Sequence, residues 1–198
     1  MDLMARYKDN YFDLAIVDPP YGIDIANWDA VDMKPSDEYF IELFRVSKNQ
    51  IIWGANYFIN NLYENRGWIC WDKYFVKTGY VNKADDFELA WTSYNKKAKI
   101  IRYTSVGNTS GFDKNIKVDY SYKGKIHPTQ KPVKLYEWLL INYAKEGDKI
   151  LDTHLGSGSI AIACHNLCFD LTACEIDTDY YNLAIERINK HKAQKRLF

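Results

Sequence analysis

Short apolar runs alternate with amphipathic segments along most of this 198-residue chain. Runs of four to five mostly apolar residues bounded by polar positions predict strands, and apolar residues at three- and four-residue spacing predict helices. The predicted strands are Asp13–Val17, Gln50–Trp53, Trp68–Trp71, Phe87–Trp91, Lys99–Tyr103, Lys149–Asp152 and Leu171–Cys174. The predicted helices are Ser36–Val46, Val133–Tyr143, Ser159–Leu167 and Asp179–Lys192, with Pro35 as a start signal for the first.

Strands and helices alternate at both ends of the chain, which predicts an α/β fold with an open, mostly parallel central sheet. From about Asn95 to Lys125 the periodicity fades, and Gly, Asn and Ser residues collect. A loop-rich stretch of this length inside a compact domain usually has a function or is disordered. Since 47% of the residues are apolar, we expect one domain over residues 1–198 with a short insertion at 95–126.

The segment Asp18-Pro19-Pro20-Tyr21 directly follows the first predicted strand. The two prolines fix their own φ angles and bias the preceding residues away from helix, so the Asp18 carboxylate is held without later reorganisation. Tyr21 adds a flat aromatic face beside it. A rigid carboxylate next to a stacking surface suits methyl transfer to the exocyclic amine of a base.

A second polar loop, Thr153-His154-Leu155-Gly156-Ser157-Gly158-Ser159, follows the predicted strand that ends at Asp152. Its two glycines let the backbone approach a ligand closely, and Ser159 can cap the next helix. Glu175 comes seventeen positions after Gly158, at the end of another strand, where an acid can accept both hydroxyls of a ribose. The loop lacks the Gly-Lys-Ser/Thr ending of a P-loop, so adenosine without phosphates is the expected ligand.

The net charge is zero, which argues against a protein that coats nucleic acid nonspecifically. Between Lys96 and Lys134, however, ten basic residues stand against two acidic ones, with aromatic residues between them. This pattern predicts a surface that neutralises phosphates, with a solvated lysine-rich loop as the alternative. The residues assigned to nucleic acid are Lys96, Lys97, Lys99, Arg102, Lys114, Lys117, Lys123 and Lys125.

The four cysteines lack CxxC spacing, so we expect reduced thiols and no metal site. There is also no run of about eighteen apolar residues and no leader-like start, which leads us to expect a cytoplasmic protein.

Three motifs occur in one consistent order: Asp18 to Tyr21 (DPPY), His127-Pro128-Thr129-Gln130-Lys131-Pro132, and the loop from Asp152 to Gly158. Together they resemble the motifs of the β-class N6-adenine DNA methyltransferases of bacteria and phages, in which the catalytic motif precedes the cofactor loop. The resemblance covers most of the chain. It implies a Rossmann-like fold with a seven-stranded sheet in circularly permuted motif order, S-adenosylmethionine as methyl donor and double-stranded DNA as substrate. It also implies that the segment between the first two motifs, which holds the insertion at 95–126, recognises the target sequence.

The resemblance also assigns roles to individual residues. Asp18, Pro19, Pro20 and Tyr21 would be catalytic: the Asp18 carboxylate and the Pro19 carbonyl accept hydrogen bonds from the amine, and Tyr21 stacks on the extruded base. Glu175 would hold the ribose, Thr129 and Lys131 would approach the methionine end of the cofactor, and Asp152 would orient the loop or the donor's amino group. The remaining cofactor residues would be Asp18, His154, Gly156, Ser157, Gly158 and Ser159.

Two departures from the family pattern affect these expectations. Related enzymes commonly carry a proline and an aromatic residue where this chain has Thr153 and His154, which bears on cofactor affinity. The chain also starts about a dozen residues before the catalytic strand, so one sheet edge is expected to be absent or supplied by a partner, as in a homodimer.

Several alternatives stay open from the sequence. The substrate could be cytosine N4 or RNA, although related cytosine-N4 enzymes more often carry serine at position 18, and RNA methylases of this type tend to have tryptophan at position 21. A catalytically idle nucleic-acid-binding subunit is the alternative from another class. Glu88 is either an exposed strand residue or a pocket acid, and Tyr57 either packs in the core or reaches the base pocket. Whether methylation belongs to a restriction-modification system stays open.

Overall fold

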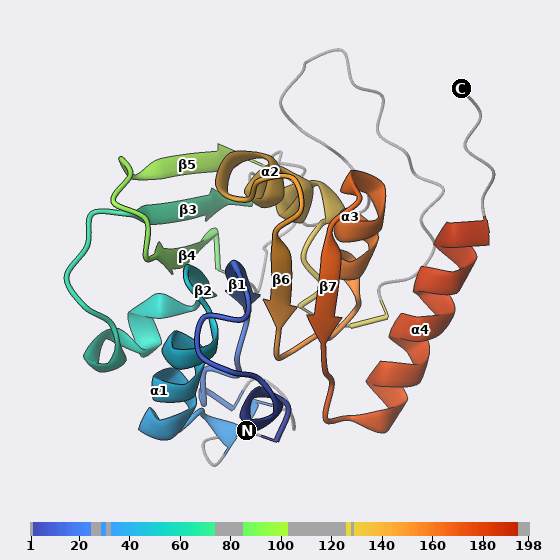
Figure 1. Cartoon of the computed structure of the whole chain (residues 1–198), viewed down its shortest axis with the longest axis horizontal. Helices are drawn as coiled ribbons and strands as arrows, with labels where there is room; N and C mark the ends of the chain where they lie inside the picture. The colour runs from blue at the N-terminus through green and yellow to red at the C-terminus, as the bar shows by residue number, and fades with distance from the viewer. Residues whose placement is uncertain are drawn as a thin grey trace.

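The computed structural model describes residues 2–24, 29–30, 33–73, 85–102, 126–127 and 129–193. These residues form a seven-stranded sheet in the order β5-β3-β4-β2-β1-β6-β7 (Figure 1). The strands are β1 (Leu14–Val17), β2 (Gln50–Trp53), β3 (Trp68–Asp72), β4 (Phe87–Thr92), β5 (Lys99–Arg102), β6 (Lys149–Asp152) and β7 (Asp170–Ala173). The helices are α1 (Asp37–Val46), α2 (Val133–Tyr143), α3 (Ser159–Leu167) and α4 (Thr178–Ala193), with short 3-10 turns at Met4–Arg6, Ala55–Tyr57 and Ile59–Asn61.

Most strand pairs are parallel, and β4 is the exception. β1 runs parallel to β2 and β6, β6 to β7, and β3 to β5, whereas β4 runs antiparallel to both β2 and β3. The predicted α/β fold with a mostly parallel sheet is therefore confirmed. Because β4 is reversed, its first residues lie at the edge where the parallel strands end, with Glu88 beside Trp71.

Helices cover both faces of the sheet. Leu14 and Ile16 of β1 belong to a buried cluster shared with α2, α3 and α4, whereas Ala15 and Val17 belong to a cluster shared with α1 and the N-terminal turn (Figure 1). All four β1 residues are buried. A strand buried on both faces reads as a continuous apolar run, which is why this short segment could be recognised in the sequence.

The predicted elements agree with the structure to within two residues at each end where both are described. β1 begins one residue late, because the Asp13 carboxylate accepts hydrogen bonds from the Lys48 amine at 2.6 Å and the Lys149 backbone N–H at 2.9 Å. β7 lies one residue earlier than predicted. Tyr103, the expected last residue of the fifth strand, lies outside the described residues, as do residues 103–125 of the insertion, so the insertion stays a prediction. None of the helices in the described ranges is both long enough and apolar enough to cross a membrane.

Candidate active site

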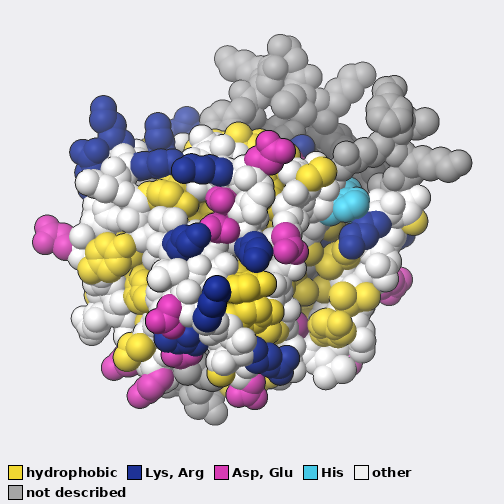
Figure 2. Space-filling model, in the orientation of Figure 1, with side chains coloured by type: hydrophobic (Ala, Val, Ile, Leu, Met, Phe, Trp, Pro, Cys, Tyr) yellow, Lys and Arg dark blue, Asp and Glu magenta, His cyan; other side chains and the backbone are white. Residues whose placement is uncertain are grey.

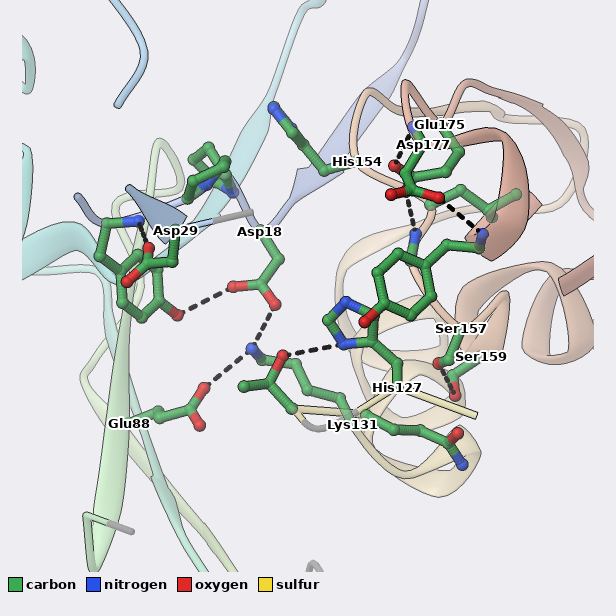
Figure 3. A pocket seen from close by; sticks show the side chains of 18 of the residues that line it. Asp18, Asp29, Glu88, His127, Lys131, His154, Ser157, Ser159, Glu175 and Asp177 are labelled. Carbon is green, nitrogen blue, oxygen red and sulfur yellow. Dashed lines mark hydrogen bonds and ion pairs between the residues drawn. The ribbon is translucent and has the colours of Figure 1, made fainter. Parts of the chain in front are cut away.

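A cavity of about 800 Å³ lies at the edge of the sheet where the parallel strands end. Most of its lining comes from the segments that follow β1, β6 and β7 and from the residues just before α2, and Tyr57, Lys73 and Glu88 complete the catalytic side. Figure 3 shows Asp18 and Lys131 on one side of this cavity, with Glu175 and Asp177 on the other. The two loops predicted from sequence, the catalytic one and the cofactor one, therefore open into the same space.

Asp18 is held by a different partner on each carboxylate oxygen. The Tyr21 hydroxyl donates to Oδ1 at 2.9 Å, and the Lys131 ammonium lies 2.5 Å from Oδ2. The carboxylate follows the last residue of β1 directly, so the strand and the two prolines fix its backbone. Both the position and the plane of this carboxylate are thus set before any ligand enters.

Lys131 belongs to a chain of alternating charges that are buried or partly buried (Figure 3). Its ammonium also contacts Glu88 Oε2 at 2.8 Å, and Glu88 Oε1 contacts the Lys73 ammonium at 2.7 Å. Burial lowers the pKa of Lys131, but the charges of Asp18 and Glu88 outweigh it, so the pKa lies above its ordinary value. Burial raises the pKa of Glu88, but the two lysines outweigh it and leave that pKa low. Glu88 is therefore a charged pocket acid and not an exposed strand residue.

Tyr21 packs into a space that only glycine leaves open. At Gly54, with φ of +64°, a Cβ atom would lie 2.0 Å from Cε1 of the Tyr21 ring. The Tyr57 ring stacks on Tyr21 with centroids 5.0 Å apart and planes 15° apart, and Tyr57 lines the cavity. Burial, followed by the Asp18 charge, raises the pKa of Tyr21 well above its ordinary value, so the hydroxyl stays a donor.

Asp29 organises the backbone after the DPPY segment, and sequence reasoning did not find it. Its buried carboxylate accepts hydrogen bonds from the backbone N–H groups of Tyr21, Gly22 and Ile23 at 2.6, 3.0 and 3.2 Å. Three N–H donors on one carboxylate hold this turn in a fixed shape. An acidic residue eight positions after a motif carries no local signal that could have revealed this role.

The glycine loop after β6 forms the opposite wall of the cavity. Gly156 has φ of +52°, and a Cβ atom there would meet only one backbone oxygen, at 3.9 Å. Glu175 accepts hydrogen bonds from the backbone N–H groups of Gly156 at 2.7 Å and Asp177 at 3.1 Å. Ser157 and Ser159 also line the cavity, and their hydroxyls lie 3.1 Å apart. Exposed backbone beside an acid at the next strand end fits a ribose-bearing ligand.

Gly158 faces a different way from Gly156. It has φ of +72°, and a Cβ atom there would lie 3.0 Å from Cδ1 of Ile188 and 3.4 Å from Cβ of Ala184, both on α4. It is absent from the cavity lining among the described residues. Its side-chain position is therefore taken up by packing between the loop and α4, which differs from the ligand contact expected of it.

Thr153 and His154, the two departures from the family pattern, take part in a hydrogen-bond chain. The Tyr39 hydroxyl on α1 lies 2.7 Å from Thr153 Oγ1, which lies 2.9 Å from His154 Nδ1. Burial lowers the pKa of His154 to about 4, so the ring is neutral at physiological pH. His154 lines the cavity, and this chain holds it against α1.

Asp152 lies beneath the glycine loop. It is buried, and its Oδ1 accepts a hydrogen bond from the His154 backbone N–H at 2.9 Å. Burial raises its pKa to about 8 despite this hydrogen bond, with smaller contributions from the Asp18 and Glu175 charges. The carboxyl group therefore carries a proton at neutral pH in the absence of a cationic ligand.

The motif before α2 supplies the wall between these two loops. Thr129 Oγ1 lies 3.1 Å from His127 Nδ1, and the His127 ring packs on Tyr180 with centroids 4.4 Å apart. Thr129, His127 and Lys131 all line the cavity. Burial lowers the pKa of His127. The amine of Lys131 is directed to the two carboxylates, Asp18 and Glu88, while Thr129 lies with the ring of His127.

The described basic residues that were assigned to nucleic acid, Lys96, Lys97, Lys99 and Arg102, lie outside the lining of this cavity. Figure 2 shows Lys and Arg side chains gathered over the region of β5, one of the two edge strands of the sheet. Lys96 donates to the Asn142 carbonyl at 2.8 Å and lies over the Tyr143 ring at 4.6 Å, whereas Arg102 pairs with Asp72 at 2.8 Å. Lys97 and Lys99 are exposed. The other basic residues assigned to nucleic acid, Lys114, Lys117, Lys123 and Lys125, lie outside the described residues.

Within the described residues there is no group of three or more His, Cys, Asp or Glu side chains arranged to hold a metal ion.

Comparisons with known proteins place these features in a family. A family model described as DNA methylase, covering N6 and N4 methyltransferases, matches residues 45–186. The type II methyltransferase M.HpaI of Haemophilus parainfluenzae is 30% identical over 226 residues, which cover 94% of this chain and 71% of M.HpaI.

Solved structures share the fold at lower identity. The M1.HpyAVI–SAM complex has a TM-score of 0.59 at 20% identity, covering 93% of this chain and 91% of that one. The cytosine-N4-specific PvuII DNA methyltransferase has a TM-score of 0.60 at 12% identity, covering 96% and 87%. The family resemblance drawn from the three sequence motifs is confirmed. The chain belongs to the DNA methylase family of N6 and N4 methyltransferases.

Proposed function

We propose that this protein is a site-specific DNA methyltransferase that transfers a methyl group from S-adenosylmethionine to the N6 amine of adenine. The observation that supports it is the shared cavity, in which an oriented, lysine-paired carboxylate faces a glycine loop and a ribose-type acid. Methyl transfer needs an amine and a sulfonium methyl in one water-poor space, and this cavity has room for both. A cavity of about 800 Å³ lies within the usual range of small-molecule sites.

The residues on the glycine-loop side fit S-adenosylmethionine. Open backbone at Gly156 would accept its close approach, and the Glu175 carboxylate would bind the ribose hydroxyls. Asp152 would balance the positive charge of the donor's amino group. This charge in turn would favour the ionised form of the Asp152 carboxyl group. When bound, S-adenosylmethionine supplies an electrophilic methyl group on a sulfonium. The family and the SAM complex of M1.HpyAVI support this cofactor.

On the catalytic side, Asp18 makes the amine a better nucleophile. The lone pair of an exocyclic amine is delocalised into the ring, so the planar amine attacks poorly. Asp18 accepts a hydrogen bond from one N–H and the Pro19 carbonyl accepts the other, and together these bonds favour a pyramidal nitrogen with a localised lone pair. Pro20 and Tyr21 hold this geometry, and no covalent intermediate with the protein is needed.

The stack of Tyr21 and Tyr57 supports an extruded base as the substrate. A base that leaves the duplex costs a few kcal/mol, and stacking on an aromatic ring can return about 1–3 kcal/mol of it. Tyr57 covers one face of Tyr21 and also lines the cavity. The two rings together thus offer the base an aromatic wall next to Asp18.

Adenine is proposed over cytosine from the motif itself, since related cytosine-N4 enzymes more often carry serine at the position of Asp18. The neighbour PvuII methyltransferase, which is cytosine-N4-specific, shares only the fold with this chain. DNA is proposed over RNA because the family is described as DNA methylase.

The product base tests this proposal directly. The purified protein is incubated with labelled S-adenosylmethionine and, in separate reactions, unmethylated plasmid DNA or RNA, and the nucleic acid is digested to nucleosides for mass identification. N6-methyladenine is the expected product. N4-methylcytosine would overturn the base assignment, and label in RNA but not in DNA would overturn the substrate class.

A further inference from the structure

Lys131 stands between the two carboxylates of the catalytic side. Its ammonium lies 2.5 Å from Asp18 Oδ2 and 2.8 Å from Glu88 Oε2, and its side chain is 2% exposed. The rings of Trp53 and Trp71 lie 5.3 and 6.0 Å from the amine. A buried charge is tolerated only when it is paired, and aromatic faces add attraction for a cation. The ammonium is therefore fixed from several sides.

One hydrogen-bond donor of this ammonium is left over. An ammonium has three N–H donors, of which Asp18 Oδ2 accepts one, and the ion pair with Glu88 Oε2 at 2.8 Å takes up at most one more. For the third, the described part of the chain offers no further acceptor within hydrogen-bond distance. Because Lys131 lines the cavity, this donor is available to a group that enters beside Asp18.

In adenine and cytosine, the exocyclic amine lies beside a ring nitrogen that accepts hydrogen bonds. In adenine the N6 amine stands one ring carbon from N1, which accepts hydrogen bonds. The Asp18 carboxylate and the Lys131 ammonium stand side by side, 2.5 Å apart, as an acceptor next to a donor. This is the complement of the amine and N1 on the Watson–Crick edge, the edge by which flipped bases are commonly read.

We propose that Lys131 donates a hydrogen bond to N1 of the extruded adenine while Asp18 accepts one from N6, and that Glu88 is the positioning residue that holds Lys131 in place. This inference rests on the proposed function and deepens it. Glu88 is suited to the task because β4 carries it and Lys73 fixes its other oxygen at 2.7 Å.

The arrangement selects among bases by hydrogen-bond pattern. Guanine and thymine carry a carbonyl oxygen beside a ring N–H, so the oxygen would face Asp18 and the N–H would face Lys131. One contact would then bring two acceptors together and the other would bring two donors together, and both contacts disfavour these bases. Cytosine presents N4 beside N3 in the same pattern as adenine, so this pair rejects guanine and thymine and accepts both adenine and cytosine.

A substrate lacking only N1 tests the contact in the wild-type enzyme. Two duplexes are compared, both carrying the site at which label is incorporated into plasmid DNA, one with adenine and one with 1-deazaadenine at the target. We expect kcat/KM to fall about 10- to 100-fold with the analogue, the range for a hydrogen bond to a charged group. Transfer to the analogue within about threefold of adenine would overturn the proposal. If the adenine duplex itself is not methylated, the proposed function has failed instead.

1-Deazaadenine also differs from adenine in its basicity, so a variant is needed to show that a lost contact between Lys131 and N1 causes the loss in kcat/KM. In Lys131→Met we expect lower kcat/KM on adenine, but a loss on changing to 1-deazaadenine of less than about threefold, because the partner of N1 is already gone. Equal losses on the analogue in both enzymes would show that Lys131 does not contact N1.

Glu88→Gln provides a second variant that keeps the shape of the site, in case Lys131→Met does not fold. It removes one of the two charges that raise the pKa of Lys131, so the alkaline limb of kcat/KM against pH should move to lower pH. The other groups that interact electrostatically with this ammonium, Asp18, His127 and Asp152, are unchanged. Glu64→Gln, at an exposed glutamate, is the control. A uniform loss with an unmoved limb would mean that Glu88 is only structural.

Discussion

At the scale of single residues, the catalytic side is a balance of charges. Asp18, Lys131, Glu88 and Lys73 alternate in sign and lie 2.5 to 2.8 Å apart, so each buried charge has an opposite neighbour. Removing one member would leave another uncompensated, which costs far more than the pair itself contributes. The site therefore has to be tested with substitutions that keep shape and remove one property at a time.

Gly54 gives such a test for Tyr21. We expect Gly54→Ala to displace the Tyr21 ring and reduce methylation about 100-fold, as misplacement of a catalytic group by about 1 Å can do. Gly147→Ala is the control: it also has positive φ, +84°, but a Cβ there meets nothing within 4 Å. Both variants should lose about 1 kcal/mol of stability from the backbone. Equal activity in the two variants would contradict the role given to this contact.

The raised pKa of Asp152 predicts how the stability of the folded protein changes with pH. Its pKa is about 8 in the folded protein, against about 3.9 in an unfolded chain, so between these values the folded protein holds a proton that the unfolded chain has lost. Its contribution to stability is thus full at low pH and falls as pH rises, by up to about 1.4 kcal/mol per unit. Between pH 5 and pH 8, Tm should fall more in the wild type than in Asp152→Asn. Parallel Tm curves would refute the buried, protonated state.

At the scale of elements, the direction of each strand decides which side chains meet. The parallel strands end at one edge, which brings the loops after β1, β6 and β7 together, and the reversed β4 brings Glu88 to the same edge. The sequence showed the two loops because prolines, glycines and an acid follow apolar runs. It left Glu88 undecided, because an antiparallel strand inserted in a parallel sheet has no local signature.

The glycine loop also has a feature that the sequence alone does not reveal. Two glycines in the sequence look alike, yet Gly156 faces open space and Gly158 faces Ile188 on α4. Which of them meets the ligand depends on a helix that follows 20 residues later, and spacing alone does not encode that contact. Asp29 and Lys73 were missed for the same reason, since their roles arise only from contacts across the fold.

The two glycines should therefore respond differently to the same substitution. Both have positive φ and carry a similar backbone cost. Gly156→Ala places a methyl group on the cavity side and should weaken S-adenosylmethionine binding, as measured by calorimetry, with a modest loss of Tm. Gly158→Ala should lower Tm more, because its Cβ would lie 3.0 Å from Ile188. The reverse ranking in both measurements would contradict this assignment.

At the scale of the whole molecule, charge is balanced overall but unevenly spread. Equal numbers of acidic and basic residues give a net charge of zero, while Lys and Arg side chains gather over β5 (Figure 2). Among the described residues assigned to nucleic acid, Arg102 ends β5 on the cavity side and Lys99 begins it at the far end, since β5 runs parallel to β3. Lys96 is engaged by Asn142 and two tyrosine rings.

This geometry predicts a ranking for DNA binding. Arg102→Ala should weaken binding to duplex DNA and reduce the slope of log Kd against log salt concentration by about 1, as expected when one phosphate contact is lost. Lys99→Ala, the matched control on the same strand, should leave the slope nearly unchanged. A larger change for Lys99 than for Arg102 would mean that DNA crosses the sheet away from the cavity.

In the proposed mechanism, Asp18 activates the amine while the opposite wall of the cavity binds the donor. The most direct measurement compares wild type, Asp18→Asn and the rim control Asp85→Asn for both S-adenosylmethionine affinity and methyl transfer to DNA. Asp18→Asn should retain donor affinity and lose methyl transfer by about 100-fold or more, the loss typical of a preorganised electrostatic contact, while Asp85→Asn keeps both. Methyl transfer near the wild-type rate in Asp18→Asn would contradict the catalytic role proposed for this carboxylate.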